Sequence, residues 1–259
     1  MSTAGVEQPD RVQSVDRAVT VLQFLAANGW SGVTDVGDAL NVHKSTAYRL
    51  LTTLEARGLV ERHTEDGKYR LGFGVLHLAN AVQVGPDLTR QAQPGCAWLA
   101  RMSDESVTLS VLDGLESVTI DQIIATSTVT TRSWLGRRTP LHCTSGGKVF
   151  LASLPPPRRA AVIAGPHHRY TARTVTDPDV LREEIEAVQA NGYATTSGEF
   201  EEGLSSAAVA IRGADGHVVA AVGVSGPSYR LDARMAEVVP LVLEAAARAS
   251  AGSVQPSPG

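Results

Sequence analysis

Cysteine, aromatic residues and long apolar runs are all scarce in this 259-residue sequence. The two cysteines, Cys96 and Cys143, are far apart and form no CxxC motif. They give no disulfide framework and no zinc-binding pattern, so we expect a protein of the reducing cytoplasm. No apolar run approaches the roughly 20 residues of a transmembrane helix. The start, MSTAGVEQPDRVQ, lacks a basic segment followed by an apolar one, so we expect no secretory signal.

An overall excess of positive charge is also missing. The formal net charge is −4, which does not by itself indicate a nucleic-acid-binding protein. Any such surface must therefore come from the local distribution of charge. Residues 1–11 and 252–259 are rich in small residues and proline, and we expect both to be disordered tails.

The first third of the chain has the pattern of a helix-turn-helix followed by a hairpin. Apolar residues at helical spacing predict helices over residues 14–29, 34–40 and 44–57. Two short strand-like runs, LVERH and KYRLGF, flank TEDG, where Asp66-Gly67 favours a tight hairpin turn. This order predicts a DNA-binding domain in which the hairpin forms a wing beside the third helix.

The third helix divides into an apolar face and a polar face. Ala47, Leu50, Leu51 and Leu54 form the apolar stripe. The opposite face carries groups that can bind phosphate oxygens and base edges in a major groove. The predicted DNA-binding residues are Lys44, Ser45, Thr46, Tyr48, Arg49 and Thr52 on the helix, and Arg62, Lys68 and Arg70 on the wing.

Charge alone does not decide what this surface binds. Residues 41–72 hold six Lys or Arg against four Asp or Glu, a local excess of only +2. A solvated helix face, or a winged helix that contacts another protein, would have a similar composition. The order of the elements favours DNA.

The rest of the chain mixes helices and strands, so the fold class is α+β. A connecting helix is expected over residues 73–83, broken at Gly85-Pro86. Asp177, Pro178 and Gly192 have the types expected at the cap, first turn and exit of a helix. We expect a helix to about residue 102 with a possible kink at Pro94, strands over 106–114 and 116–124, helices over 144–154 and 177–192, a hairpin over 206–226, and a last helix over 232–251 that Pro240 bends or interrupts.

Several motifs resemble the IclR family of bacterial transcriptional regulators. They are VQSVDRAVTVLQFLA, KSTAYRLLTTLEARGLVER and GKYRLGFGVLHLA in the first part, and GRRTPLHCTSGGKVFLA and GYATTSGEFEEGLSSAAVAIRGADGHVVAAVGVSGP in the second. The resemblance implies a winged helix-turn-helix domain over residues 12–72, a linker helix over 73–86 and a GAF-like effector-binding domain over 87–251. It also implies homodimers or dimers of dimers on palindromic operators, whose affinity changes when a small effector binds. The family contains repressors and activators, and we expect a repressor.

The stretch from Thr144 to Lys148 is the best candidate for the effector site. It begins a predicted helix, and small residues at a helix N-terminus leave N–H groups open to an anion. The resemblance supports this reading and favours an organic acid. The alternative is that both glycines only permit close packing, with Lys148 in solvent. By the resemblance, the effector-binding positions are Ser145, Gly146, Ser206, Gly223 and Ser225, together with Glu199, which belongs to the motif but in the alternative reading orients the loop and does not touch the ligand. Leu141, Val149 and Trp134 are candidate apolar walls.

Catalytic and metal-binding readings find little support. His142-Cys143 has no third ligand or catalytic partner at a usual spacing. His167-His168 is expected to be a loop pair. The GGKV stretch is not a phosphate-binding P-loop, because Val149 stands where a Ser or Thr would hold magnesium. We therefore expect no cofactor and no enzyme activity, and keep a small-molecule-processing enzyme as the alternative.

Overall fold

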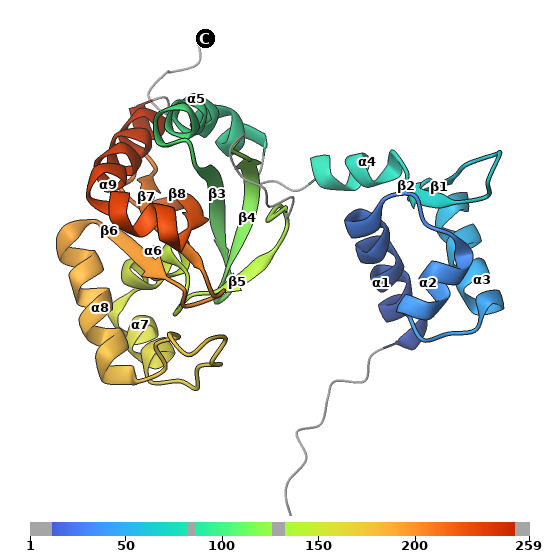
Figure 1. Cartoon of the computed structure of the whole chain (residues 1–259), viewed down its shortest axis with the longest axis horizontal. Helices are drawn as coiled ribbons and strands as arrows, with labels where there is room; N and C mark the ends of the chain where they lie inside the picture. The colour runs from blue at the N-terminus through green and yellow to red at the C-terminus, as the bar shows by residue number, and fades with distance from the viewer. Residues whose placement is uncertain (1–11, 82–85, 126–132, 252–259) are drawn as a thin grey trace, which may run out of the picture. The chain divides into compact units, whose positions relative to one another are not determined.

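The computed structural model describes residues 12–81, 86–125 and 133–251, and divides into two compact units, Met1–Gln83 and Val84–Gly259. Each unit is described by itself (Figure 1). The expected tails at 1–11 and 252–259 lie outside the described residues.

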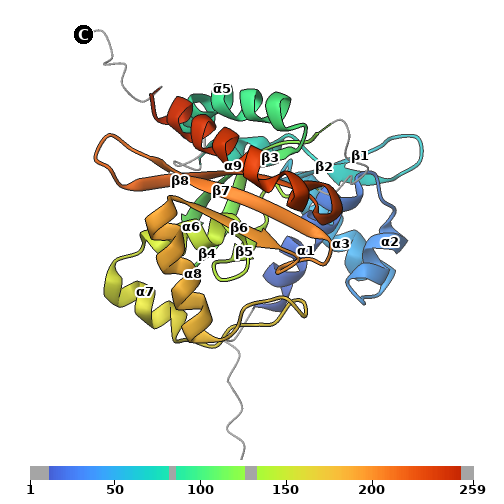
Figure 2. The same ribbon diagram turned by 60° about the vertical axis from the view of Figure 1, so that its left-hand side comes forward.

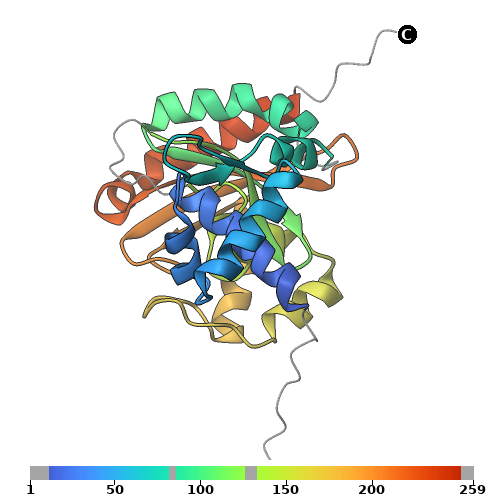
Figure 3. The same ribbon diagram turned by 90° about the vertical axis from the view of Figure 1, so that its right-hand side faces the viewer.

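The first unit consists of three helices and a two-stranded wing. Its elements are α1 (Gln13–Asn28), α2 (Val33–Ala39), α3 (Lys44–Ala56), β1 (Val60–Arg62) and β2 (Tyr69–Leu71). Each predicted helix is confirmed to within about a residue, and Figure 3 shows the three packed around one another. The strands pair antiparallel, with Val60 opposite Leu71.

A small apolar core holds this unit together. The inward-facing positions of the three helices meet the two wing strands at Val60 and at Tyr69, which is fully buried. The wing turns at Gly67, whose φ of 69° lies in the left-handed region that only glycine adopts without strain. The core residues are Val21, Leu25, Val36, Ala47, Leu51, Leu54, Val60 and Tyr69.

A short helix follows the wing. The expected helix over 73–83 is α4 (Gly74–Asn80) in the structure, and the expected residues 82 and 83 lie outside the described part. Three large apolar side chains here are mostly exposed, namely Phe73 at 77%, Leu76 at 59% and Leu78 at 57%. The first unit thus ends in an apolar surface of its own.

The second unit is a six-stranded antiparallel sheet with helices on both faces (Figure 2). The strand order is β5-β4-β3-β8-β7-β6. Its elements are α5 (Pro86–Ser103), β3 (Ser106–Asp113), β4 (Glu116–Ile123), β5 (Arg138–Pro140), α6 (Ser145–Ser153), α7 (Pro156–Ile163), α8 (Pro178–Asn191), β6 (Tyr193–Ser197), β7 (Leu204–Arg212), β8 (Val218–Pro227) and α9 (Ser228–Ala251).

Two of these elements, β6 and α7, escaped prediction. β6 is an edge strand of five residues, too short to show clear alternation. The prolines that follow the helix expected over 144–154 begin α7, because proline suits a first helical turn. By contrast, α5 and α9 continue through Pro94 and Pro240, and α9 starts four residues before the expected Asp232.

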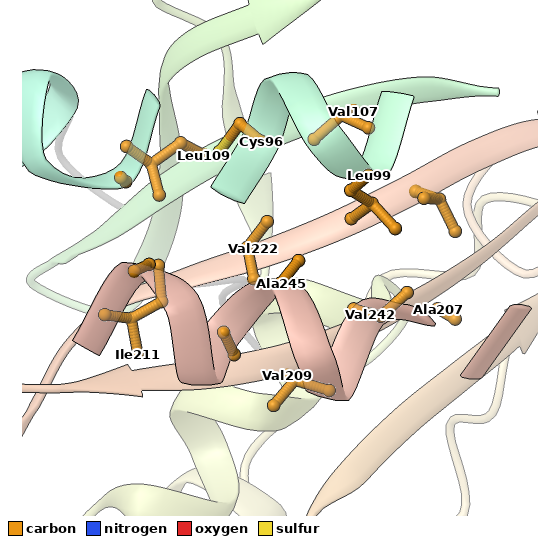
Figure 4. Close-up of a cluster of buried hydrophobic side chains, with 14 of the residues drawn as sticks. Cys96, Leu99, Val107, Leu109, Ala207, Val209, Ile211, Val222, Val242 and Ala245 are labelled. Atoms are coloured by element: carbon orange, nitrogen blue, oxygen red, sulfur yellow. The ribbon is translucent and has the colours of Figure 1, made fainter. Parts of the chain in front are cut away.

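The two faces of the sheet differ in what covers them. Helices α5 and α9 lie on one face, where Leu109, Val209 and Val222 point into the larger core (Figure 4). Helices α6, α7 and α8 cover part of the other face, onto which Ala208 and Ala221 point. Because side chains alternate along a strand, residues next to those of the large core face the α6 side. Near the start of α6 those residues are small or polar, which leaves room for the cavity described below.

Candidate functional site

The polar face of α3 is exposed while its apolar stripe is buried. Lys44, Ser45, Tyr48 and Arg49 are exposed at the start of the helix, Tyr48 at 46%. On the other side, Ala47, Leu51 and Leu54 are buried in the first unit's core. Thr46 and Thr52 are half-buried at the border. The helix therefore presents cations, hydroxyls and an aromatic ring on one continuous surface.

The cations of this face are not neutralised within the unit. In the described part of the chain, neither Lys44 nor Arg49 forms an ion pair. The hydroxyls differ, because Thr52 Oγ1 donates to the backbone oxygens of Tyr48 (3.0 Å) and Arg49 (3.1 Å). Of the predicted helix residues, Lys44 and Arg49 thus have the most free donors for phosphate or base edges.

The wing cations, by contrast, have partners on the wing or beside it. Arg70 pairs with Glu61, and its guanidinium lies 4.5 Å from the ring centroid of Trp30. Lys68 Nζ lies 3.5 Å from Asp66 Oδ2. The hydrogen bond from the Lys68 backbone N–H lowers the pKa of Asp66, so this carboxyl stays ionised. Arg62 has no acidic partner among the described residues and stacks 5.8 Å from the ring centroid of Tyr69.

A cavity opens on the α6 face of the second unit's sheet. It encloses about 670 Å³ including its mouth, a size that suits a small metabolite. Half of the twenty described residues that line it are serine or threonine: Thr108, Ser110, Ser117, Thr119, Thr139, Thr144, Ser145, Thr196, Ser206 and Ser225. The others are Trp134, Cys143, Gly146, Phe200, Glu201, Leu204, Ala208, Ala221, Gly223 and Val224.

The structure brings together six of the nine predicted effector residues. Ser145, Gly146, Ser206, Gly223, Ser225 and Trp134 all line the cavity. Leu141 and Val149 do not, because both are buried in the core between α6, α7 and α8. Glu199 is also absent from the walls, since its carboxylate is engaged elsewhere.

Glu199 forms an ion pair with Lys148. Lys148 is 2% exposed, and its Nζ lies 2.8 and 2.7 Å from the two carboxylate oxygens of Glu199 and 2.9 Å from Glu184 Oε2. The alternative with Lys148 in solvent is therefore wrong. Burial raises the pKa of the Glu199 carboxyl, and the Lys148 ammonium opposes this shift. The cluster ties α6 to α8 and to the β6–β7 connection, whose next residues line the cavity.

The two glycines at the start of α6 have different surroundings, since Gly147 is closely packed and Gly146 faces open space. A Cβ at Gly147 would meet Thr144 Oγ1 at 2.5 Å and the Pro140 oxygen at 2.6 Å, so this glycine permits close packing. A Cβ at Gly146 would meet nothing closer than Ser117 Oγ at 3.7 Å. The Gly147 N–H donates a hydrogen bond to Thr144 Oγ1, while the N–H groups of Ser145 and Gly146 have no acceptor among the described residues.

His142 and Cys143 are both buried, and burial shifts the pKa of each toward its neutral form. Burial raises the pKa of the Cys143 thiol to about 12, so the nucleophilic thiolate is disfavoured. Burial also lowers the pKa of His142, whose ring stacks on that of His167 at 4.6 Å. The ring nitrogen Nε2 of His142 bonds to the His168 backbone oxygen. Among the described residues, no group of three or more His, Cys, Asp or Glu is arranged to hold a metal.

Sequence reasoning missed most of the hydroxyl wall. Thr108, Ser110, Ser117, Thr119, Thr139 and Thr196 come from strands of the α6 face and were not predicted. The signal was present in SVTLSVLD, where Thr108 and Ser110 alternate with the apolar residues of the large core. That these side chains all line one cavity depends on the order of the strands in the sheet, which the local sequence pattern does not give.

Two family models match the chain, one in each unit. The model described as "IclR helix-turn-helix domain" matches residues 14–64. The model described as "Bacterial transcriptional regulator IclR C-terminal" matches residues 81–251. None of the helices described is long and apolar enough to cross a membrane.

Curated and solved relatives cover both parts. The HTH-type transcriptional regulator Rv1719 of Mycobacterium tuberculosis is 33% identical over 233 residues, covering 90% of this chain and 89% of the relative. The HTH-type transcriptional repressor AllR of Escherichia coli is 33% identical, covering 85% and 82%. The structure of an IclR homolog complexed with 4-hydroxybenzoate from Microbacterium hydrocarbonoxydans aligns with a TM-score of 0.77 at 28% identity, covering 93% and 98%.

Proposed function

Since this chain belongs to the IclR family of bacterial transcriptional regulators, we propose that it represses its target genes until an organic acid binds the cavity of its second unit. It is a DNA-binding regulator with a C-terminal effector domain, and not an enzyme. The proposal concerns the sign of regulation, the chemistry of the effector, the contacting residues and the assembly. Repression is supported by the relative AllR, which is named a repressor.

The observation that carries the DNA-binding assignment is the split surface of α3. Its buried side fixes the helix on the core, and its exposed side leaves Lys44 and Arg49 free. We assign major-groove contacts to Lys44, Ser45, Thr46, Tyr48, Arg49 and Thr52. Arg62, Lys68 and Arg70 of the wing contact the flanking phosphates, and Arg62 contributes most there because it has no acidic partner among the described residues.

A homodimer, or a dimer of dimers, on a palindromic operator fits the first unit. Besides the exposed apolar residues of α4, the outer face of α1 exposes Val15 at 60% and Val19 at 47%. Apolar side chains this exposed are typical of surfaces that a partner covers. We assign residues 12–72 to DNA binding, 73–86 to the linker and 87–251 to the effector domain. The protein acts in the cytoplasm, where a bacterial chromosome lies.

An organic acid is the effector class that the start of α6 supports. The free N–H groups of Ser145 and Gly146, together with the positive end of the helix dipole, stabilise a carboxylate. The solved relative with 4-hydroxybenzoate holds a molecule of this class. No Lys, Arg or His lines the cavity in the described part of the chain, so here backbone dipoles and hydroxyls replace a cation.

The test is operator binding measured with and without ligand. An operator is first selected from random duplexes, and a panel of small carboxylates is then added at fixed salt, since phosphate contacts make affinity salt-dependent. We expect one or more carboxylates to release the operator. A panel that leaves binding unchanged, while a neutral compound releases the DNA, contradicts the organic-acid assignment.

A further inference from the structure

The hydroxyl groups of the cavity exceed what a carboxylate alone needs. Ten of the twenty lining residues are serine or threonine, and they come from six strands and the start of α6. Six of these side chains already form hydrogen bonds within the protein, while four form none with another described residue: Thr108, Ser117, Ser145 and Ser225. A ligand with an apolar body would desolvate these four hydroxyls without giving them partners, which is costly. A ligand with its own hydroxyl groups would replace the lost water.

Two of these hydroxyls belong to largely buried residues, line the cavity and have no partner among the described residues. Ser117 is 3% exposed and Ser145 is 5% exposed, and neither side chain forms a hydrogen bond with any other described residue. Buried hydroxyls in proteins are nearly always bonded. Since the Cβ position of Gly146 lies 3.7 Å from Ser117 Oγ, Ser117 on β4 faces the first turn of α6. These two hydroxyls and the α6 N–H groups form one end of a polar binding site.

A row of three further hydroxyls crosses the sheet. Thr196, Ser206 and Ser225 stand opposite one another on β6, β7 and β8, with Thr196 Oγ1 and Ser206 Oγ 2.7 Å apart. Beside the row, Ala208 pairs with Gly223 and leaves the floor flat. Opposed side chains on neighbouring strands are about 5 Å apart, so the row spans about 10 Å, comparable to a ligand with a chain of five or six carbons.

We propose that the effector is a small polyhydroxylated carboxylate of the sugar-acid class. Its carboxylate binds Ser117 Oγ and the N–H groups of Ser145 and Gly146. Its hydroxyls bind the row formed by Thr196, Ser206 and Ser225. This inference rests on the organic-acid effector proposed above and names the body to which the acid group is attached.

Calorimetric titration of the full chain with matched compounds tests the inference. The probes are erythronate, xylonate and gluconate, with hexanoate as the six-carbon acid without hydroxyls, glucitol as the polyol without a carboxylate, and 4-hydroxybenzoate as an aromatic acid. We expect at least one sugar acid to bind about tenfold or more tightly than hexanoate and glucitol, the difference that one or two hydrogen bonds supply.

Variants locate the binding. Ser117→Ala and Thr196→Val should each weaken sugar-acid binding about tenfold. Thr195→Val, on the same strand but exposed and pointing to the other face, should leave it unchanged. Unfolding midpoints identify any variant that fails to fold. Because Ser117 has no protein partner in the described residues, its variant remains informative if Thr196→Val loses stability.

The outcomes separate this inference from the proposed function. Tighter binding of hexanoate or 4-hydroxybenzoate overturns the hydroxylated class and leaves an organic-acid effector standing. Glucitol binding as tightly as the sugar acids, or failure of every acid to bind, overturns both. If Ser117→Ala and Thr196→Val both leave sugar-acid binding unchanged, the assignment of these residues to the binding site is overturned.

Discussion

The two units treat charge in opposite ways. On α3, Lys44 and Arg49 stand in solvent without an acidic partner among the described residues. In the second unit, Lys148 is 2% exposed and lies between two glutamates. The cavity beside it is lined mostly by neutral side chains, half of them hydroxyls, with Glu201 as the acidic residue among those described. Exposed cations suit a polyanion such as DNA, whose phosphates supply the missing charge. Buried neutral dipoles suit a small ligand, because a buried cation in their place would be unpaired, and therefore costly, whenever the ligand is absent.

The comparison teaches that residue type alone does not identify a ligand contact. Lys148 directly follows the glycines of the α6 start, yet it pairs with Glu199 and is not among the described residues that line the effector cavity. Ser117 lies in a strand with no recognised motif, yet it lines the cavity opposite Gly146. Burial and existing partners separate structural groups from binding groups.

The largest expected effect comes from breaking the buried ion cluster. Lys148→Met removes the cation and leaves Glu199 buried without its main partner, which should lower the free energy of unfolding by about 3–5 kcal/mol. Urea unfolding measures this. Arg182→Met breaks an exposed pair with Asp179 on α8 and should change little. Equal losses in the two variants would show that burial does not distinguish these ion pairs.

Two neighbouring glycines sharpen the distinction between packing and binding. Gly147→Ala places a methyl group 2.5–2.7 Å from fixed atoms and should destabilise the second unit by about 1–3 kcal/mol. Gly146→Ala places the same group in the open cavity, so it should leave the unfolding midpoint nearly unchanged and weaken effector binding. Thermal unfolding and calorimetry together separate the two effects. If Gly146→Ala lowered the unfolding midpoint and Gly147→Ala only weakened effector binding, the assignment of Gly146 to the cavity and Gly147 to packing would be wrong.

The DNA-binding face is tested with two arginines, one in the first part of α3 and one directly after its last residue. Arg49→Ala should weaken operator binding by about 1–3 kcal/mol, as for the loss of a bidentate base contact. Arg57→Ala, at the other end of α3, should have a smaller effect. Fluorescence anisotropy with a labelled operator at fixed salt measures both. Should Arg57→Ala cost more than Arg49→Ala, the start of α3 is not the part that reads the groove.

The smallest effect concerns pH. Burial lowers the pKa of His142 in the folded state, so the unfolded chain takes up this proton first as pH falls. Stability from His142 is therefore present above the ordinary histidine pKa and declines as pH decreases through it. The raised pKa of Glu199 acts in the opposite direction. His142→Gln should remove the His142 contribution, so wild type and variant should converge in stability as pH is lowered from 7.5 to 5.5. A constant difference would contradict the assignment.

Much of the fold was predictable because short sequence patterns, such as apolar spacing, turn residues and helix caps, determine it. The helices of the first unit follow from apolar spacing, the wing from Asp66-Gly67, and α8 from Asp177, which caps it through bonds to the N–H groups of Asp179 and Val180. Edge strand β6 was missed because five residues do not define a period.

The site was less predictable than the fold. The start of α6 could be found because small residues precede an apolar run. The Lys148–Glu199 pair joins positions 51 residues apart, and Ser117 reaches the cavity only through the strand order, so neither follows from local sequence. Likewise, the wing residues Lys68 and Arg70 looked as available as Arg49 until their acidic partners were located.

The most direct measurement is selection of bound duplexes from a random library by the wild-type protein and by Arg49→Ala, followed by salt titration of the recovered sequence. We predict that the wild type enriches one palindromic sequence, that its affinity falls steeply with salt, and that Arg49→Ala binds this sequence more weakly. No enrichment by the wild type, or equal binding by both proteins at every salt concentration, would contradict the claim that the exposed face of α3 reads DNA.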